Sequence, residues 1–418
     1  MGRSIPEVEP MTPTTFNPFG YDKPTRRAIA FLNVAHAMDH FVLLIYPTVV
    51  IGLGVVFERS YSELIALSTA AFVAFGVFSL PAGWLADRWS RRNMMATFYF
   101  GCGLSLAVAG WAPTMELLAV GLFGIGVFAS IYHPVGMAML VEASQARGRT
   151  LAFNGVCGNL GVSLAAGISA GLATWLGWRA AFYVPAALSI GVGVLYVWLT
   201  PDDRHHVKHR KSTPAVSLVP HMAIIFFGLY ITITMTGGTV FNLLTIALPK
   251  IVDERLAAHV PLLLAGSVAT LVLICGALAQ LSVGRLVERF SVHGLFAVIT
   301  GMGFLGNLWA AYADGIPLMI ALAIAVSAIY GQVTVNDMLL ARYTADAWRG
   351  RVYAVRYFLL FVSAAAAIGM ISYLHATGGF TLVLAVNAAI AFTIFVATTA
   401  LALLVNNIEV RQTTQAAE

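Results

Sequence analysis

The chain has 418 residues, of which 59% are hydrophobic and 10% are charged. Soluble domains carry roughly 25% charged and about 45–50% apolar residues, so this composition excludes a soluble domain and predicts a membrane protein. The formal net charge of +5 comes from basic residues scattered over short segments, which does not indicate a nucleic-acid partner.

Apolar runs of about 20 residues, each long enough to cross a bilayer, recur along most of the chain. The first 26 residues are instead polar and proline-rich and lack the apolar core of a signal peptide, so we expect 1–26 to form a cytoplasmic tail. Because the alternation of a β-barrel is absent, the runs predict an all-α membrane protein. The twelve predicted spans are 27–51, 64–86, 94–112, 117–141, 150–176, 179–199, 221–248, 262–287, 294–312, 316–341, 352–376 and 379–405.

A polar segment interrupts these runs near the midpoint of the chain. Residues 200–220 contain His205, His206 and His209 beside four Lys or Arg residues. We interpret the segment as a cytoplasmic linker; a metal-sensing or regulatory role for its histidines is the alternative. The linker separates a six-helix bundle over 27–199 from a second over 221–405, and residues 406–418 form a cytoplasmic tail.

Basic residues gather in alternate loops of this arrangement. Of the 24 Lys and Arg residues, 20 fall on one side of the predicted spans, and the other side holds Arg59, Arg179, Lys250 and Arg255. Cytoplasmic loops carry the excess of Lys and Arg, so both termini are predicted to be cytoplasmic. We expect a monomer in a bacterial cytoplasmic (inner) membrane, with no nucleic-acid partner.

The two halves share short motifs at one period. Gly83–Arg88 has a counterpart in Gly284–Arg289, 201 positions later, and Arg147–Arg149 recurs 202 positions later as Arg349–Arg351. The matches occupy the same places in the span pattern, which indicates a duplication. Two repeated halves around a central site are an architecture of transporters.

The segment Gly83–Arg92, GWLADRWSRR, resembles the signature of the loop between spans 2 and 3 in the major facilitator superfamily, Gly-x-x-x-Asp-Arg-x-Gly-Arg-Arg. Ser90 replaces the second Gly of the signature. The resemblance implies two pseudo-symmetric six-helix bundles, alternating access, and a cytoplasmic gate motif that holds the halves together; the alternative is that the arginines only set the topology. The residues assigned to the gate motif are Gly83, Asp87, Arg88, Arg91, Arg92, Gly284, Glu288 and Arg289.

Three other segments are similar to fosmidomycin-resistance-type exporters. They are His36–His40, Ile131–Pro134 and Gly158–Leu164. The chain departs from that pattern with Asp39-His40 in place of Asn-Asp, and with Ala165-Ala166 where drug/proton antiporters often carry Gly-Pro. The resemblance implies proton-linked export of a small organic compound.

The residues themselves point to a site in the first span. His36, Asp39 and His40 have the spacing i, i+3 and i+4, which places them on one face of a helix. Asp39 follows Arg27 by a helical length of roughly 18 Å, which puts it near the bilayer midplane, where ionisable groups are costly and usually functional. We predict a proton or substrate site; a structural polar network is the alternative, and the same face could ligate a divalent metal ion.

Further candidates are polar side chains within other spans. Asn154 and Asn159 could equally join helices, Asp337 could pair with Arg342, and Arg356 could extend toward water. The remaining substrate or proton candidates are Tyr132, His133, Asn154, Asn159, Asn242, Gln332, Asn336, Asp337 and Arg356.

Motifs for other activities are lacking in the sequence. No Gly-Lys-Ser/Thr phosphate loop occurs, so uphill transport should use an ion gradient, and no nucleophile–base pair indicates an enzyme. No cofactor is expected, and no residue is assigned as a metal ligand. We predict a secondary transporter, with proton-coupled export first. Uptake of an organic anion or a divalent metal ion is the alternative, and a non-transporting membrane receptor or assembly partner is a remote one.

Overall fold

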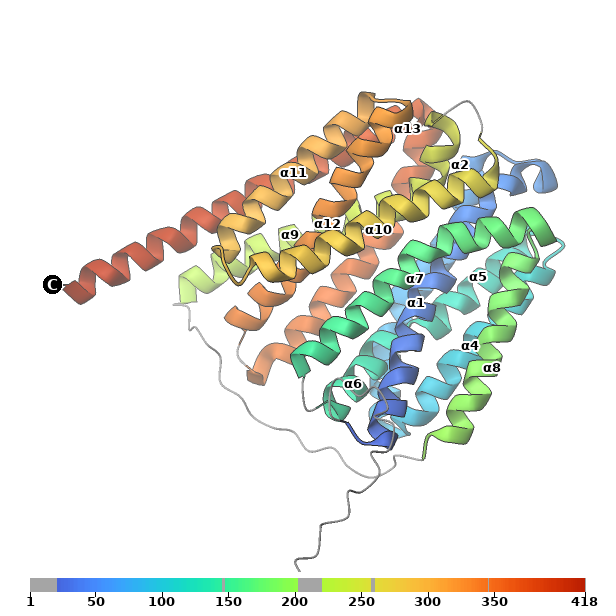
Figure 1. The fold of residues 1–418 in the computed structure, drawn as a ribbon, viewed down its shortest axis with the longest axis horizontal. Coiled ribbons are helices and arrows are strands. Elements are labelled where there is room, and N and C mark those ends of the chain that lie inside the picture. Colours follow the sequence, from blue (N-terminus) through green and yellow to red (C-terminus); the bar gives the residue numbers. More distant parts are fainter. Residues whose placement is uncertain (1–20, 145–146, 202–219, 257–259, 345, 418) are drawn as a thin grey trace, which may run out of the picture.

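The computed structural model describes residues 21–144, 147–201, 220–256, 260–344 and 346–417. All regular elements in these ranges are helices, as the composition predicts. The histidines of the linker and most of the predicted N-terminal tail lie outside the described residues. The two halves stand side by side (Figure 1).

Within the described residues, the first half contains eight α-helices and a short π-helix, η1. They are α1 (Lys23–Phe57), α2 (Tyr61–Ile65), α3 (Ser68–Arg88), α4 (Arg91–Trp111), α5 (Met115–Ala129), η1 (Tyr132–Gly136), α6 (Met137–Ala143), α7 (Arg147–Leu176) and α8 (Ala180–Leu199). The second half is formed by α9 (Pro220–Arg255), α10 (Leu262–Leu286), α11 (Val292–Tyr312), α12 (Gly315–Tyr343) and α13 (Asp346–Ala417).

Eleven helical stretches among the described residues are long and apolar enough to cross a membrane. The last of them, Phe358–Leu404, has 47 residues, which as one helix would measure about 70 Å, more than twice the hydrocarbon thickness of about 30 Å. Its backbone is broken at Gly378 and at Gly379, whose φ of 60° favours glycine. Figure 1 shows α13 turning back at this point. α13 therefore supplies two crossings, and the twelve predicted spans are accounted for.

Several predicted boundaries differ from the structure. The predicted second span is divided between α2 and α3, and the fourth among α5, η1 and α6. The last helix continues to Ala417, into the predicted tail 406–418, because residues 405–417 contain neither Gly nor Pro to end it.

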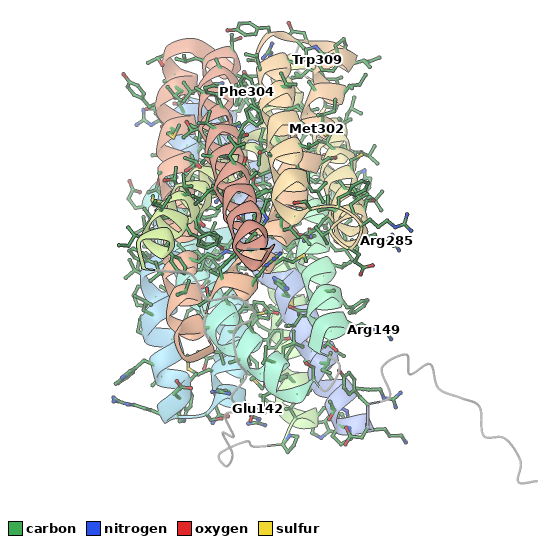
Figure 2. The ribbon with its side chains drawn as sticks, turned by 90° about the vertical axis from the view of Figure 1, so that its left-hand side faces the viewer. Glu142, Arg149, Arg285, Met302, Phe304 and Trp309 are labelled. Atoms are coloured by element: carbon green, nitrogen blue, oxygen red, sulfur yellow. The ribbon has the colours of Figure 1, made fainter. Side chains whose placement is uncertain are left out.

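The outer surface is apolar, as a lipid environment requires. Met302 and Trp309 are 49% and 45% exposed, and Figure 2 shows them on the outside of the bundle, with Glu142 and Arg149 toward its other end. We call the end that holds the turn Asp87–Arg92 the basic end. The opposite end holds the turn Phe57–Tyr61 and the segment Lys250–Arg255.

Two of the seams between the halves hold close contacts among the described residues. In the first, between α7 and α10, the Gly167 amide donates a hydrogen bond to Thr270 Oγ1 over 2.9 Å. A Cβ at Gly266 would lie 2.6 Å from the Ala166 carbonyl oxygen, so glycine permits this close approach. In the second, between α3 and α13, Gly76 faces the Phe361 side chain.

Candidate functional site

The site begins with a close crossing of α1 and α7. A Cβ at Gly158 would lie 2.5 Å from His36 Nε2, and a Cβ at Gly161 would lie 2.0 Å from the Ala37 carbonyl oxygen. Real Cβ atoms do not approach other atoms so closely, so both positions depend on glycine. The sequence segment that begins at Gly158 therefore allows the His36 ring to lie against the backbone of α7.

A hydrogen-bond network fixes the His36 ring. Its Nδ1 lies 2.8 Å from both the backbone oxygen and the side-chain oxygen of Asn154. Because both partners are carbonyl oxygens, Nδ1 is the donor. Tyr132 also donates to Asn154 Oδ1 over 3.0 Å, and Asn154 Nδ2 donates to Asn33 Oδ1 over 2.9 Å. The fully buried Asn154 thus joins α1, η1 and α7.

Asp39 lies near the middle of α1 and is completely buried. Its carboxylate pairs with His133, the distance from Oδ2 to His133 Nε2 being 3.3 Å. No described residue donates a hydrogen bond to either carboxylate oxygen. A buried carboxylate with so little compensation is costly, and such groups in a membrane interior generally mark ion or substrate sites.

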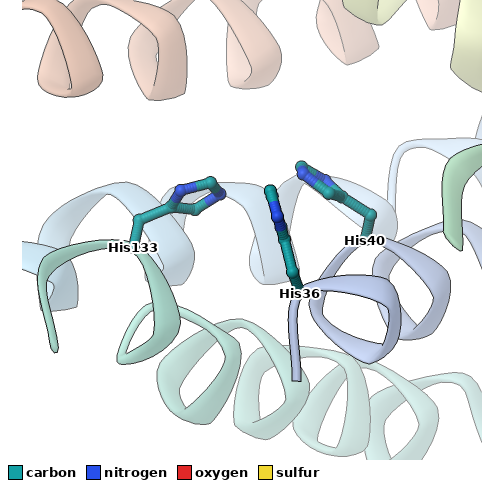
Figure 3. A group of neighbouring side chains, drawn as sticks. All are labelled: His36, His40 and His133. Atoms are coloured by element: carbon teal, nitrogen blue, oxygen red, sulfur yellow. The ribbon is translucent and has the colours of Figure 1, made fainter. Parts of the chain in front are cut away.

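His133 also forms a cluster with His36 and His40 (Figure 3). The ring of His36 lies 5.1 Å from that of His40, and the His133 ring lies 5.5 Å from each of them. His133 is carried by η1, where the adjacent Pro134 lacks an N–H group and the turn widens into a π-helix. π-Helical turns of this kind often occur at functional sites.

The second half of the chain reaches this cluster through Phe361 of α13. The Phe361 ring lies 4.5 Å from that of Phe75 in α3 and 6.3 Å from that of His133. The histidines therefore lie at the junction of the two halves, where a relative movement of the halves would change their surroundings.

The other predicted residues of the first half have different surroundings. Asn159 extends across the first seam and donates a hydrogen bond to Gln280 of α10, so it joins the halves. Sequence reasoning did not select Gln280, although a lone amide in an apolar span was a signal for it.

The described residues of the second half that were predicted for the site contact other helices of that half or their own helix. Gln332 is buried and lies where a Cβ at Gly237 would contact it, and Asn242 donates to the Gly238 carbonyl oxygen within α9 over 2.8 Å. Asn336 is buried. Asp337 pairs with Arg356 of α13.

The pairing of Asp337 differs from the alternative that the sequence left open, in which its partner was Arg342. Five residues along a helix turn the side chain by about 140°, so these two side chains point in different directions from α12. Arg356 is buried rather than extended toward water, because α13 packs it against Asp337.

The contacts that the signature turn at the basic end makes with described residues include several within the first half. Arg91 bonds to Asp87 over 3.1 Å and to Glu142 over 3.0 Å. Arg92 donates to the Val197 and Thr200 carbonyl oxygens, the Arg88 guanidinium lies 4.0 Å from the Trp84 ring, and a Cβ at Gly83 would lie 3.3 Å from Pro134 Cβ. These bonds join α3, α4, α6 and α8. The gate between the halves, including the contribution of Gly284, Glu288 and Arg289, stays a prediction.

A polar cluster at the opposite end does join the halves. His375 of α13 lies 3.0 Å from Ser62 Oγ through Nδ1 and 3.1 Å from Glu254 through Nε2, and Lys250 pairs with Glu254 over 3.3 Å. Ser372 also donates to the Ser62 carbonyl oxygen over 2.8 Å. We call these five residues the opposite-end cluster. In the sequence, Lys250 indicates only the topology.

Replacing His375 with Ala is expected to favour a state in which the halves separate at the opposite end. The change removes the bond to Ser62 and leaves Glu254 without its partner on α13. Coupling free energies of about 1–3 kcal/mol correspond to shifts of about 5- to 150-fold in a conformational equilibrium. Distances between spin labels on the exposed residues Arg59 and Thr377 would measure this shift.

Glu63→Gln provides a local control for that experiment. Glu63 lies beside Ser62, but its carboxylate accepts hydrogen bonds from Ser60 of the same half. An equal change in the distance distribution of the two variants would contradict a role for the opposite-end cluster in closing this end.

Comparison with known proteins places the chain in a family. A sequence profile described as Major Facilitator Superfamily matches residues 29–266, which is more than half of the chain. The chain belongs to the Major Facilitator Superfamily. This membership agrees with the twelve-span fold and with the expectation of a transporter rather than an enzyme.

Two curated relatives illustrate the range of proteins to which the chain is similar. The 4-hydroxybenzoate transporter PcaK of Pseudomonas aeruginosa is 27% identical over 277 residues, covering 56% of this chain and 60% of that protein. The puromycin resistance protein pur8 of Streptomyces alboniger is 33% identical over 139 residues, covering 32% of this chain and 27% of that protein. The chain thus spans less than two thirds of either relative.

The fold also matches a solved structure over almost its full length. The crystal structure of a bacterial homolog to the human lysosomal transporter Spinster, in an inward-facing and occupied conformation, superposes with a TM-score of 0.71. The match covers 92% of this chain and 95% of the other at 14% sequence identity. Such a match establishes the shared fold.

Proposed function

We propose that the chain is a secondary transporter that exports a small organic compound in exchange for protons, by alternating access. Membership of the Major Facilitator Superfamily supports the transport cycle. The observation that carries the proton coupling is the buried pair of Asp39 and His133, at the junction of the two halves.

In this proposal, Asp39 and His133 exchange a proton with the aqueous phase of whichever side the site faces. Both groups can change charge, and His is the side chain whose ordinary pKa is nearest to physiological pH. The pair lies in the interior of α1 and in η1, whose wide turn adjoins the cluster. The amides of Asn33 and Asn154 and the Tyr132 hydroxyl would orient the polar groups of the compound.

The change of the site from facing one side of the membrane to facing the other would involve contacts at both ends of the molecule. The opposite-end cluster joins the halves, whereas the bonds given above between the signature turn and other described residues lie within the first half. With the basic end in the cytoplasm, as the distribution of Lys and Arg predicts, this arrangement corresponds to a site closed toward the outside. If the opposite-end cluster separated and the halves instead came into contact at the basic end, the site would then face the outside.

Export is the direction that we propose, because the segments around His36, His133 and Gly158 are similar to exporters and because a relative is named as a resistance protein. Uptake of an organic anion is the second candidate, since another relative is named as a transporter of 4-hydroxybenzoate.

Reconstitution into liposomes tests the proposal directly. Vesicles with the basic end facing outward would be given an acidic interior and offered a panel of radiolabelled antibiotics and aromatic acids. Gradient-dependent accumulation of a compound inside, which corresponds to export from a cell, would support the proposal. Accumulation only when the interior is alkaline, so that protons and compound enter together, would favour uptake, and solute flux that ignores the pH gradient would contradict proton coupling.

A further inference from the structure

Three histidine side chains converge within the membrane interior at a distance that suits a metal ion. Each of His36, His40 and His133 offers a ring nitrogen, and these nitrogens all lie within 4.8 Å of one another. The rings approach from two separate elements, α1 and η1, and Figure 3 shows them gathered around one point. We propose that these three histidines bind a divalent transition-metal ion of the Zn²⁺ class.

The ligand type and number fit this class of ion. Imidazole nitrogens suit Zn²⁺, Co²⁺ and Ni²⁺, whereas Ca²⁺ and Mg²⁺ prefer oxygen. Three histidines with an open fourth position form a common tetrahedral arrangement, in which Zn–N bonds of about 2.0–2.1 Å place the nitrogens about 3.3 Å apart. Moving each ring by roughly 1 Å from the present arrangement would reach that geometry, and rotation about the side-chain bonds supplies such movements.

A neighbouring group holds one of the rings as metal ligands are usually held. The other ring nitrogen of a metal-bound histidine is normally bonded to a carbonyl or carboxylate oxygen. His36 Nδ1 donates to the oxygens of Asn154, which leaves Nε2 as its metal-binding atom. His133 Nε2 lies 3.3 Å from the Asp39 carboxylate, an ion-pair distance without a hydrogen bond.

Charge also favours a cation at this position. Asp39 is fully buried, and no described residue donates a hydrogen bond to its carboxylate, so a nearby cation would offset its unfavourable burial. Nothing in the cluster besides Asp39 carries a permanent charge, since histidines bind metal in their neutral form. Asp39 and the three rings together would therefore hold a divalent ion with one compensating negative charge.

Metal binding can be measured without any transport assay. The full chain would be purified in detergent micelles with His205, His206 and His209 replaced by Ala, because these linker histidines could bind metal themselves. Titration with Co²⁺, followed by its visible absorption, and competition with Zn²⁺ would give the stoichiometry and affinity. We expect one ion per chain at a site of imidazole ligands.

The His40→Gln and His133→Gln variants test the assignment. Each removes one ligand, and we expect the affinity to fall by at least about tenfold. His293→Gln is the matched control and should retain the affinity of the parent protein, since His293 of α11 bonds to Tyr343 of α12 away from the cluster. Far-ultraviolet circular dichroism and gel filtration would confirm that each variant is folded.

Absence of stoichiometric Co²⁺ or Zn²⁺ binding to the folded parent protein would overturn the proposal. Equal affinity in the two ligand variants and the control would do the same. Transport of the bound ion across the membrane would depend on the proposed function. Because binding is measured without a gradient and flux is measured with one, failure of the metal site and failure of the transport proposal give separate results.

Discussion

Replacing Asp39 with Asn is expected to reduce the proton-driven flux of the transported compound to the level of protein-free liposomes. Asn keeps nearly the same shape but cannot change its charge. The side chain at position 39 can then no longer accept and release a proton beside His133. Asp39 is fully buried and lies 3.3 Å from His133. The measurement is gradient-driven uptake into reconstituted vesicles.

A second assay separates proton coupling from folding and substrate binding. Exchange of labelled for unlabelled compound at equal pH on both sides needs no net proton movement, so Asp39→Asn should retain it. Asp314→Asn is the matched control, since Asp314 is an exposed carboxylate that pairs with Arg255 over 2.8 Å at the opposite end. Undiminished pH-driven flux in the Asp39 variant would exclude this carboxylate as the proton carrier.

The sequence predicted the fold well because hydropathy depends on local composition. Long apolar runs can satisfy their backbone groups in a bilayer only as helices or closed barrels, and this single constraint determines the class of structure. Even the last turn was correctly placed between residues 376 and 379, where Gly378 and Gly379 interrupt α13. The helical extension to Ala417 was missed because polar residues outside the membrane give no hydropathy signal.

The part of the site that lies on α1 was partly predictable from spacing within that helix. The separations of His36, Asp39 and His40 place them on one face of α1 whatever the tertiary structure. Their contacts with His133 and Asn154 depend on how closely α1 approaches η1 and α7, and this approach is set by the glycines of α7. Local periodicity contains no such information, which is why Asn33 was not selected.

Pairings between separate helices limited the prediction for the second half. Asp337 bonds to Arg356 of another helix, and His375 contacts Ser62, a residue more than 300 positions earlier. Contacts of this kind follow from the packing of whole helices. Sequence spacing can identify the polar residues but not their partners.

The glycine at position 161 should be the most sensitive of the glycines that separate α1 from α7. Its absent Cβ would lie 2.0 Å from the Ala37 carbonyl oxygen, which belongs to the backbone and cannot rotate away. Gly161→Val would force the two helices apart beside His36 and Asn154. We expect a loss of stability of about 3 kcal/mol or more, the upper range for overpacking, measured as a lower midpoint of thermal unfolding.

Gly155→Val is the control that isolates this steric effect. Gly155 lies on the same helix, and a Cβ there would have no atom within 4 Å, so both variants share the same change in helix propensity. Only Gly161→Val should disrupt the contact of α1 with α7, and the Co²⁺ affinity of any folded fraction should fall as His36 moves away from Asn154. If both variants unfolded at the same temperature, the close crossing of α1 and α7 would not be what positions the histidines.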